Sequence, residues 1–429
     1  MRNPVRNALM NGSIRRSLLT IAVSLFVCSL AFAAEPAPAN KNSCLDCHSL
    51  LEENLKVTPE QFAQDVHAGK GLTCASCHGG DPNSDDKAMD KSAGFVGHIR
   101  RAQIPALCGK CHADAAYIRR FNPSLRTDQL PQYLTSVHGK KLAQGDEKVA
   151  VCTDCHGLHG IRAISDTQSS VHPLNVAKTC SRCHADREYM KSYSIPTDQF
   201  AGYSASVHQE ALTVRGDLSA PTCTTCHGNH GASPPGVASV ENVCSTCHAL
   251  QAQLFDTSPH KVAFAAAGQP GCVTCHSNHR IIRPTDALLG PGPGSVCSNC
   301  HSPGDAGLQA AGQIRTSLEA LDTKIGSSDQ ILKRAASSGM EVSDAQLELG
   351  HAKDSSTKAR VTLHSFDPKL VQKDVEAGTK ITDQAYQAGV QAMHERDYRR
   401  MGLGVSLAAI LAVLIGLKLW ISDSEKKHD

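Results

Sequence analysis

Apolar residues follow different patterns in different parts of the chain. Near the N-terminus, an apolar run at 18–32 follows four arginines and ends in Ala31-Phe32-Ala33, which is a small-residue pattern accepted by signal peptidase. We therefore predict a signal peptide at 1–33 and a linker at 34–43. An uncleaved anchor helix is the alternative, although this run is shorter than the about 20 residues that a membrane span needs.

A second apolar run, at 401–421, contains one charged residue, Lys418, close to its end. Trp420, the only tryptophan of the chain, lies at the same end, where long cations and aromatic rings can reach the polar lipid heads. A core helix of a soluble protein rarely runs so long without a polar face. We predict a transmembrane helix at 401–421 and a cytoplasmic tail at 422–429, with the mature chain before them exported.

Between 302 and 400, apolar or small residues recur at alternating spacings of three and four, the pattern of packed helices. The pattern breaks at Gly339 and resumes after it, which predicts a coiled-coil-like stalk built on an antiparallel helical hairpin. Pro368 opens a third helix that we expect to continue into the membrane segment, about 80 Å long at 1.5 Å per residue. The predicted seam consists of Ala311, Ile314, Leu318, Leu321, Ile325, Ser328, Leu332, Ala335, Val342, Ala345, Leu349, Ala352, Ser356, Ala359, Leu363 and Phe366.

The region 44–301 lacks such long periodic stretches. Clusters of glycine and proline, such as 79–82 and 290–294, divide it into short helices joined by loops. Aromatic residues make up only 4% of the chain, which is too few for a conventional core of this size. Something other than side chains must therefore fill the interior of this region.

Cysteine and histidine supply that missing component. Of the 19 cysteines, 18 form nine C-x-x-C pairs, each followed at once by a histidine, whereas Cys28 lies in the signal segment. Composition alone would give about 0.04 such motifs. In a c-type site the two cysteines bind the haem vinyl groups and the histidine ligates the iron. Zinc ribbons also use C-x-x-C pairs, but they do not require a histidine after every pair.

We therefore predict nine covalently bound haem c groups, which would themselves form the core of 44–301. The haem-binding cysteines are Cys44, Cys47, Cys74, Cys77, Cys108, Cys111, Cys152, Cys155, Cys180, Cys183, Cys223, Cys226, Cys244, Cys247, Cys272, Cys275, Cys297 and Cys300. The proximal iron ligands are His48, His78, His112, His156, His184, His227, His248, His276 and His301.

The same region holds nine further histidines, one for each predicted iron. This match favours two histidine ligands on most irons, and hence low-potential electron carriers rather than open catalytic irons. Methionine competes poorly, because only Met89 and Met190 occur here. The candidate distal ligands are His67, His98, His138, His159, His172, His208, His230, His260 and His279.

Three units repeat one order: a histidine, then C-x-x-C-H-x-x-H, then a loop and a second C-x-x-C-H. They occupy about 136–184, 206–248 and 258–301. An earlier unit, at about 65–112, has Asp81 where the others have the second histidine, and His98 is the candidate substitute.

The first motif stands outside these units. His172 could be the distal ligand for the haem of this motif or of a neighbouring motif. The sequence therefore does not assign individual ligand pairs. His351, His364 and His394 lie in the predicted stalk. We favour surface histidines on helices over haem ligands, because the haem region already holds enough ligands. Whether the hairpin contacts a partner stays open.

The formal net charge of +2 argues against a polyanion such as nucleic acid as partner. Without the four signal arginines, 39 basic residues face 41 acidic ones, a difference of −2. Haem propionates would make the mature protein more acidic still. We expect partners with basic docking faces, whose association weakens as salt rises.

The segment CASCHGGDP…GFVGHIRRAQIPALCGKCH and the CHGxHG sites preceded by S-V-H resemble multihaem c-type cytochromes of anaerobic respiratory bacteria, over about 44–301. The likeness is greatest to periplasmic cytochrome subunits of inner-membrane quinol-oxidising complexes. In those complexes the haem domain works beside a b-type cytochrome or is fused to one. One C-terminal span cannot form a four-helix b-haem bundle, so the resemblance implies a separate membrane partner, a b-type cytochrome or an iron–sulfur protein. The small quinol dehydrogenases of nitrate and nitrite respiration differ in having an N-terminal anchor and fewer haems.

The predicted fold class is mostly α with extensive loops: a multihaem cytochrome c domain, a helical stalk and one transmembrane helix. The predicted function is electron transfer in the bacterial inner membrane, with the haem domain in the periplasm, from a quinol-linked membrane partner to periplasmic cytochromes or a terminal reductase.

The alternative is a multihaem reductase of nitrite, hydroxylamine or a sulfur oxyanion at an open iron. The C-x-x-C-K motif of ammonia-forming nitrite reductases is absent from the sequence, and we assign no catalytic residue. Direct quinol oxidation at the membrane face is a third option.

Overall fold

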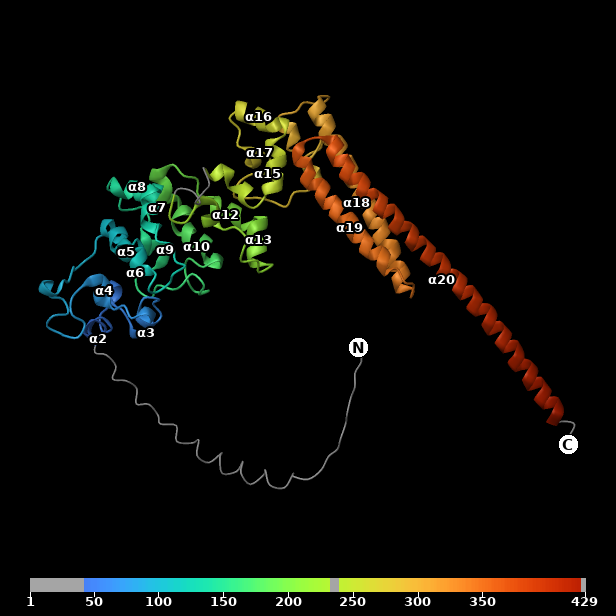
Figure 1. Ribbon diagram of the computed structural model, residues 1–429, viewed down its shortest axis with the longest axis horizontal. Coiled ribbons are helices and arrows are strands. Elements are labelled where there is room, and N and C mark those ends of the chain that lie inside the picture. The colour runs from blue at the N-terminus through green and yellow to red at the C-terminus, as the bar shows by residue number, and fades with distance from the viewer. Residues whose placement is uncertain (1–41, 232–238, 426–429) are drawn as a thin grey trace, which may run out of the picture. The chain divides into compact units, whose positions relative to one another are not determined.

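The computed structural model describes residues 42–231 and 239–425 (Figure 1). The predicted signal peptide at 1–33, most of the linker at 34–43 and the end of the predicted tail, 426–429, lie outside the described residues. The described part of the chain is mostly helical and contains no strand, as predicted for the fold class. It divides into two compact units between Ile99 and Arg100, within the repeat predicted at 65–112. Each unit is described by itself.

The first unit consists of short helices that begin at capping residues. Asn42 and Thr58 accept hydrogen bonds from the backbone amides of Leu45 and Gln61, which fixes the starts of α2 and α3. Two of its helices, α2 and α4, carry the first two C-x-x-C-H motifs. Its elements are α2 (Ser43–His48), η1 (Glu53–Leu55), α3 (Pro59–Ala63), η2 (Ala68–Lys70), α4 (Cys74–His78) and η3 (Lys91–Ala93).

The second unit begins with short helices up to about residue 300. The serine of two S-V-H segments is an N-cap: Ser136 and Ser206 accept hydrogen bonds from Gly139 and Gln209. Each cap places the following histidine in the first helical turn. The elements are η4 (Arg101–Gln103), α5 (Ile104–His112), α6 (Ala115–Ile118), α7 (Gln129–Thr135), α8 (Val137–Ala143), α9 (Cys152–His156), α10 (Pro173–His184), α11 (Arg187–Met190), η5 (Lys191–Tyr193), α12 (Gln199–Ser204), α13 (Val207–Thr213), α14 (Cys223–His227), η6 (Val240–Thr246), α15 (Ala249–Asp256), α16 (Pro259–Ala266), α17 (Gly271–His276), η7 (Asp286–Leu288) and η8 (Cys297–Asn299).

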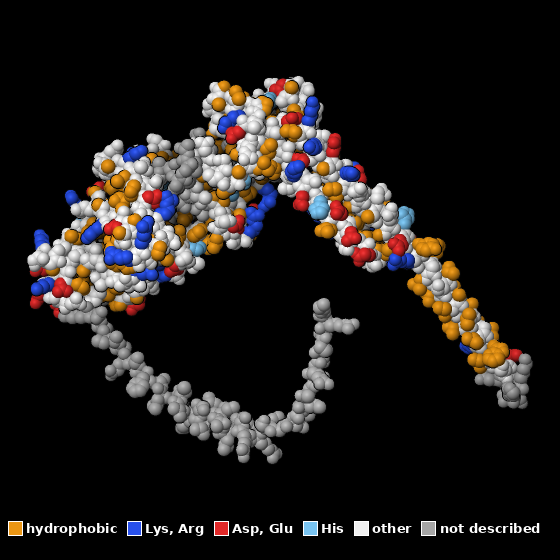
Figure 2. Space-filling view, in the orientation of Figure 1, with side chains coloured by type: hydrophobic (Ala, Val, Ile, Leu, Met, Phe, Trp, Pro, Cys, Tyr) orange, Lys and Arg blue, Asp and Glu red, His pale blue; other side chains and the backbone are white. Residues whose placement is uncertain are grey.

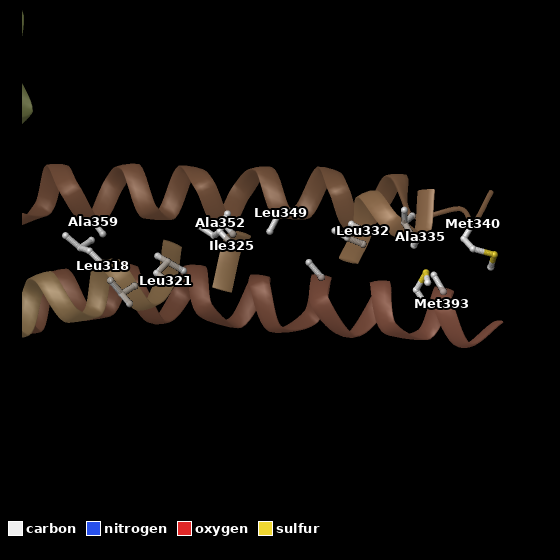
Figure 3. Close-up of a cluster of buried hydrophobic side chains, with 14 of the residues drawn as sticks. Leu318, Leu321, Ile325, Leu332, Ala335, Met340, Leu349, Ala352, Ala359 and Met393 are labelled. Atoms are coloured by element: carbon white, nitrogen blue, oxygen red, sulfur yellow. The ribbon is translucent and has the colours of Figure 1, made fainter. Parts of the chain in front are cut away.

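Three long helices follow: α18 (Ala306–Ser337), α19 (Ser343–Thr362) and α20 (Pro368–Glu425), with the short η9 (Leu363–Ser365) before α20. The helix α20 packs along both α18 and α19, so the predicted hairpin is completed by a third helix (Figures 1 and 3). A Cβ atom at Gly378 of α20 would lie 3.0 Å from Ser355 and 3.1 Å from Leu321. The absence of a side chain at this glycine therefore lets α20 approach both partners closely.

Most of the predicted seam residues lie in the core of this bundle, whereas Ala311 is half-buried outside it (Figure 3). Leu318, Leu321 and Leu332 are wholly buried, and Leu349 of α19 is 2% exposed. Phe366 departs from the seam: its backbone is left-handed at φ 55°, and its ring leaves the bundle core. The heptad spacing does not extend to this residue because the helix ends before it.

Polar contacts join α20 to the other two helices of the bundle. The Lys324 ammonium lies 2.7 Å from the Asp383 carboxylate, and that of Lys358 lies 2.8 Å from Asp374. The buried Ser328 hydroxyl donates to the Thr382 carbonyl oxygen at 2.9 Å. Such satisfied polar groups fix the register of the helices without leaving an unpaired group in the core.

The C-terminal part of α20 extends beyond the bundle core as a bare apolar helix (Figure 2). Among residues 42–231 and 239–425, it is the one segment long and apolar enough to cross a membrane. None of its most apolar window is buried in the protein, unlike the core helix of a soluble protein. Exposed apolar area on this scale requires a covering surface, and a bilayer is one that fits the length of the segment.

We predict that Leu349→Ala lowers the free energy of unfolding of the bundle by about 2–4 kcal/mol, because it opens a cavity between tightly packed helices. Leu347→Ala, two residues away on the same helix, is the matched control, since Leu347 is 66% exposed. Denaturant unfolding of the full chain in detergent, followed by far-ultraviolet circular dichroism, measures both. Equal effects of the two substitutions would contradict the packing described for α19.

Candidate functional site

Most C-x-x-C-H motifs form a short helix of their own or end a longer one. The spacing of three places both cysteines on one helix face, and the histidine follows at the C-terminal end. In α9 the chain then reverses at Gly157, with φ 87° and ψ 173°, a conformation open essentially to glycine alone. Ser277 takes the same conformation after α17, at φ 63°. The reversal ends the helix at the histidine and redirects the chain.

Five motif histidines in the second unit face a second histidine across a gap. The ring centroids are 5.8–6.2 Å apart. The planes are nearly parallel in three pairs, at 8°, 16° and 22°, and inclined at 56° and 72° in the other two. In the order of these angles the pairs are His156–His230, His227–His279, His276–His364, His138–His184 and His260–His301.

This separation fits one metal ion between two imidazoles. A metal–imidazole bond is about 2.0 Å and a ring nitrogen lies about 1.1 Å from its ring centre, so two axial imidazoles place their centroids about 6.2 Å apart. Within the described ranges, no group of three or more His, Cys, Asp or Glu side chains is arranged to hold a metal. Two axial ligands with further ligands from a bound macrocycle therefore suit these pairs better than a zinc site made of protein ligands alone.

Burial favours the neutral form of many of these imidazoles. It lowers the pKa of His156, and the neighbouring His230 and His112 lower it further. Burial likewise lowers the pKa of His138, His184, His208, His227, His230, His260, His276 and His279. A lower pKa favours the neutral ring, which is the form that ligates a metal.

Hydrogen bonds orient several of the rings from their Nδ1 side. The Nδ1 atom of His48 lies 2.7 Å from the Leu55 carbonyl oxygen, and that of His67 lies 2.9 Å from the Asp65 carboxylate. A partner at Nδ1 fixes the ring and leaves Nε2 to the metal, as is common for ligating histidines. His301 is held in the same way by Asp305, at 3.1 Å.

The remaining candidate ligands fall into different environments. His208 and His248 are near enough for His248 to lower the pKa of His208, after the larger effect of burial. His172 is 4% exposed, and its Nδ1 accepts a hydrogen bond from Leu174 as the N-cap of α10. His98 is exposed in the segment before η4, and His159 follows α9 in a loop. The role of these histidines as ligands stays a prediction, as it does for the paired ones.

The structure differs from expectation at one histidine of the stalk. His351 and His394 are exposed, as expected for surface residues. His364 is half-buried in η9, and its ring faces His276 of the eighth motif at 6.1 Å. Its spacing along the heptad stretch gave no sign of this contact, because the chain leaves the helix at this point.

Cysteines of consecutive motifs lie beside one another. A hydrogen bond with Cys223 raises the pKa of the Cys180 thiol, and one with Cys272 raises that of Cys244. Cys108 lowers the pKa of Cys152 in the same way. In the first unit, burial raises the pKa of Cys44, and the nearby Cys74 raises it further.

The other junctions of the second unit show the same closeness. Burial raises the pKa of Cys155, Cys226 and Cys275, and thiols of the following motif raise it further in each case. These thiols are Cys183, Cys247 and, for Cys275, both Cys297 and Cys300. From Cys108 to Cys300 each motif therefore adjoins the next in chain order, so groups bound to them would also be neighbours.

Comparisons with known proteins agree with this arrangement. The family model described as Cytochrome c3 matches residues 66–185 and 218–302, which contain eight of the nine motifs. The C-type polyheme cytochrome OmcC of Geobacter sulfurreducens is 23% identical over 238 residues, 52% of this chain and 26% of that protein. The cytochrome c-type protein NrfB of Haemophilus influenzae is 23% identical over 174 residues, 35% of this chain and 66% of that protein.

The chain thus spans about a quarter of the length of OmcC. The first motif and the helical bundle lie outside the family match. No solved structure matches the chain.

We predict that His230→Ala converts one low-spin haem to high-spin, because the ring facing His156 is lost while the cysteine attachments remain. Electron paramagnetic resonance measures the spin state, and the pyridine haemochrome spectrum measures haem content. His351→Ala is the control, since its side chain is 57% exposed and its ring lies 3.4 Å from Glu348 on the same helix. A folded, fully haem-loaded His230→Ala protein without a new high-spin signal would contradict the ligand role.

Proposed function

We propose that this chain, which is a multihaem c-type cytochrome, carries nine haem c groups and passes electrons from a quinol-linked membrane partner to periplasmic acceptors in anaerobic respiration. The observation that carries the proposal is the contact between cysteines of consecutive motifs. Cysteines attach the macrocycle at its edge, so adjoining cysteines bring macrocycle edges together. Such an order suits a path for electrons along the chain.

The residues of each site have separate roles in this function. The cysteines would attach the haem, and the motif histidine and the histidine facing it would both bind its iron. Bound haem would supply reversible one-electron transfer, at a potential set by its ligands and its burial. A pair such as His227 and His279 would leave the iron no free position for a substrate, which favours a carrier over a reductase.

The apolar end of α20 supports attachment to a membrane. It is exposed, and its length suits one bilayer crossing. Export of the chain before this span would place the haem region on the periplasmic side of a bacterial inner membrane. One span is too little to build a b-type haem bundle, so we propose a separate quinol-oxidising partner, a b-type cytochrome or an iron–sulfur protein.

We predict that a menaquinol analogue reduces this cytochrome in native membranes that also contain the partner. We expect no comparable reduction when the purified full-length protein is reconstituted alone in phosphatidylethanolamine–phosphatidylglycerol vesicles. The absorbance of reduced haem c reports the rate in both preparations. Equal rates in the two preparations would show that this protein oxidises quinol directly, without a partner. No reduction in either preparation would contradict the quinol link.

The reductase alternative is tested on the same purified protein. Dithionite-reduced protein should not bind carbon monoxide and should not be reoxidised at catalytic rates by nitrite, hydroxylamine or sulfite, because the axial positions are closed. The His230→Ala protein provides the positive control for carbon monoxide binding, since one axial position is opened. Carbon monoxide binding together with rapid turnover by the unaltered protein would favour the reductase.

We predict that deletion of 401–429 releases a haem-loaded protein into the periplasmic soluble fraction, because the apolar part of α20 is removed while the bundle core ends before it. Cell fractionation with haem staining measures the distribution. Retention in the membrane after this deletion would show that the signal segment is not cleaved or that another surface holds the protein there.

A further inference from the structure

Two of the three repeats in the second unit follow one rule for the first motif of the repeat. His156, in the repeat at 136–184, faces His230 of the next repeat. His227, in the repeat at 206–248, faces His279 of the repeat after it. In both cases the facing residue is the second histidine of C-x-x-C-H-x-x-H. The repeats at 206–248 and 258–301 thus each supply an imidazole to the repeat before them.

The rule leaves the last repeat, 258–301, without a donor, because no further C-x-x-C-H-x-x-H segment follows it. Its first motif ends at His276, which is half-buried at the end of α17. The residue that faces His276 is His364, from the helical bundle and 88 positions further along the chain.

The geometry of this pair matches that of the two pairs that obey the rule. The centroids of His276 and His364 are 6.1 Å apart and the planes differ by 22°. The other two pairs have 6.2 Å and 8°, and 5.8 Å and 16°. The pairs whose facing histidine begins a helix, such as His260–His301, have inclined planes instead, at 56° and 72°. His364 therefore resembles the second histidine of a repeat in separation and in orientation.

The His364 ring is also oriented for ligation. Its Nδ1 donates a hydrogen bond to the Val361 carbonyl oxygen at 2.9 Å, which leaves Nε2 as the free lone pair. The Ser365 hydroxyl donates to the Thr362 carbonyl oxygen at 2.7 Å and ties the short η9 turn to the end of α19. The left-handed Phe366 then redirects the chain into α20.

Contacts on both sides of η9 hold the bundle against the last repeat. The Phe366 ring lies 3.9 Å from the ring of His260, centroid to centroid. The Arg360 guanidinium binds both carboxylate oxygens of Asp286, at 2.6 and 3.1 Å, and also lies 2.6 Å from Asp322. Bidentate pairing of this kind fixes direction as well as distance. The position of His364 is thus set by neighbours from the haem region and from the bundle.

We propose that His364 is the distal axial ligand of the haem attached through Cys272, Cys275 and His276. The helical bundle then completes the haem region rather than only spacing it from a membrane. The proposal rests on the haem binding proposed above. It assigns a ligand outside the segment 44–301, where the nine candidate distal ligands lie, and outside the family match.

His364→Ala in the full-length protein should convert one haem to high-spin, with haem content unchanged, and should allow that one haem to bind carbon monoxide. Added imidazole should restore the low-spin signal, because it can occupy the opened position. His351→Ala, in the same bundle, should leave the spectrum unchanged. His364→Met should keep the haem low-spin and raise its potential, since a thioether ligand raises the potential relative to imidazole. The His364→Met variant tests the assignment even when the His364→Ala protein does not fold.

Electron paramagnetic resonance and redox titration of the single altered haem distinguish the outcomes. A folded His364→Ala protein with all its haems low-spin would overturn the assignment, as would a His364→Met protein with an unchanged set of potentials. His230→Ala, measured beside them, separates this failure from failure of the wider scheme. If His230→Ala gives a high-spin haem and His364→Ala does not, paired-histidine ligation holds and only the role of His364 is lost.

Discussion

Two imidazoles held about 6 Å apart form the interaction on which the haem region depends. A short helix ending in a histidine has little apolar surface of its own, so its position must come from what it binds. In the proposed arrangement, a covalently attached macrocycle with a ligand on each face would join two such helices. The distances between His156 and His230 and between His227 and His279 would then matter for folding as well as for chemistry.

The two parts of the second unit are stabilised in different ways. The bundle of α18, α19 and α20 buries leucines such as Leu318 and Leu332 completely, as in an ordinary helical protein. The preceding region has few buried side chains for its length, in keeping with the low aromatic content of the sequence. We therefore expect the bundle to depend less on bound cofactors for its folding than the haem region does.

Local patterns predicted much of this arrangement. The heptad spacing located α18 and α19 because burial in a bundle leaves a regular mark on the sequence, and Leu321 and Leu349 lie where it placed them. The C-x-x-C-H motifs identified the cofactor, because covalent attachment requires neighbouring residues. The pairing of histidines could not be predicted in this way, because the repeats have similar local sequences. The partner of His227, for example, comes from another repeat. His364 looked like a surface residue because its environment is formed by η9, where the helical spacing ends.

The helix α20 runs from Pro368 to Glu425 without interruption. At 1.5 Å per residue it is a rod about 87 Å long, with the apolar segment at one end and the η9 turn immediately before the other. A continuous helix has no hinge at which tilt or rotation could be absorbed. Mechanically, the exposed apolar segment and the turn that carries His364 belong to one lever, so a force that reorients the segment acts directly on the packing around that imidazole.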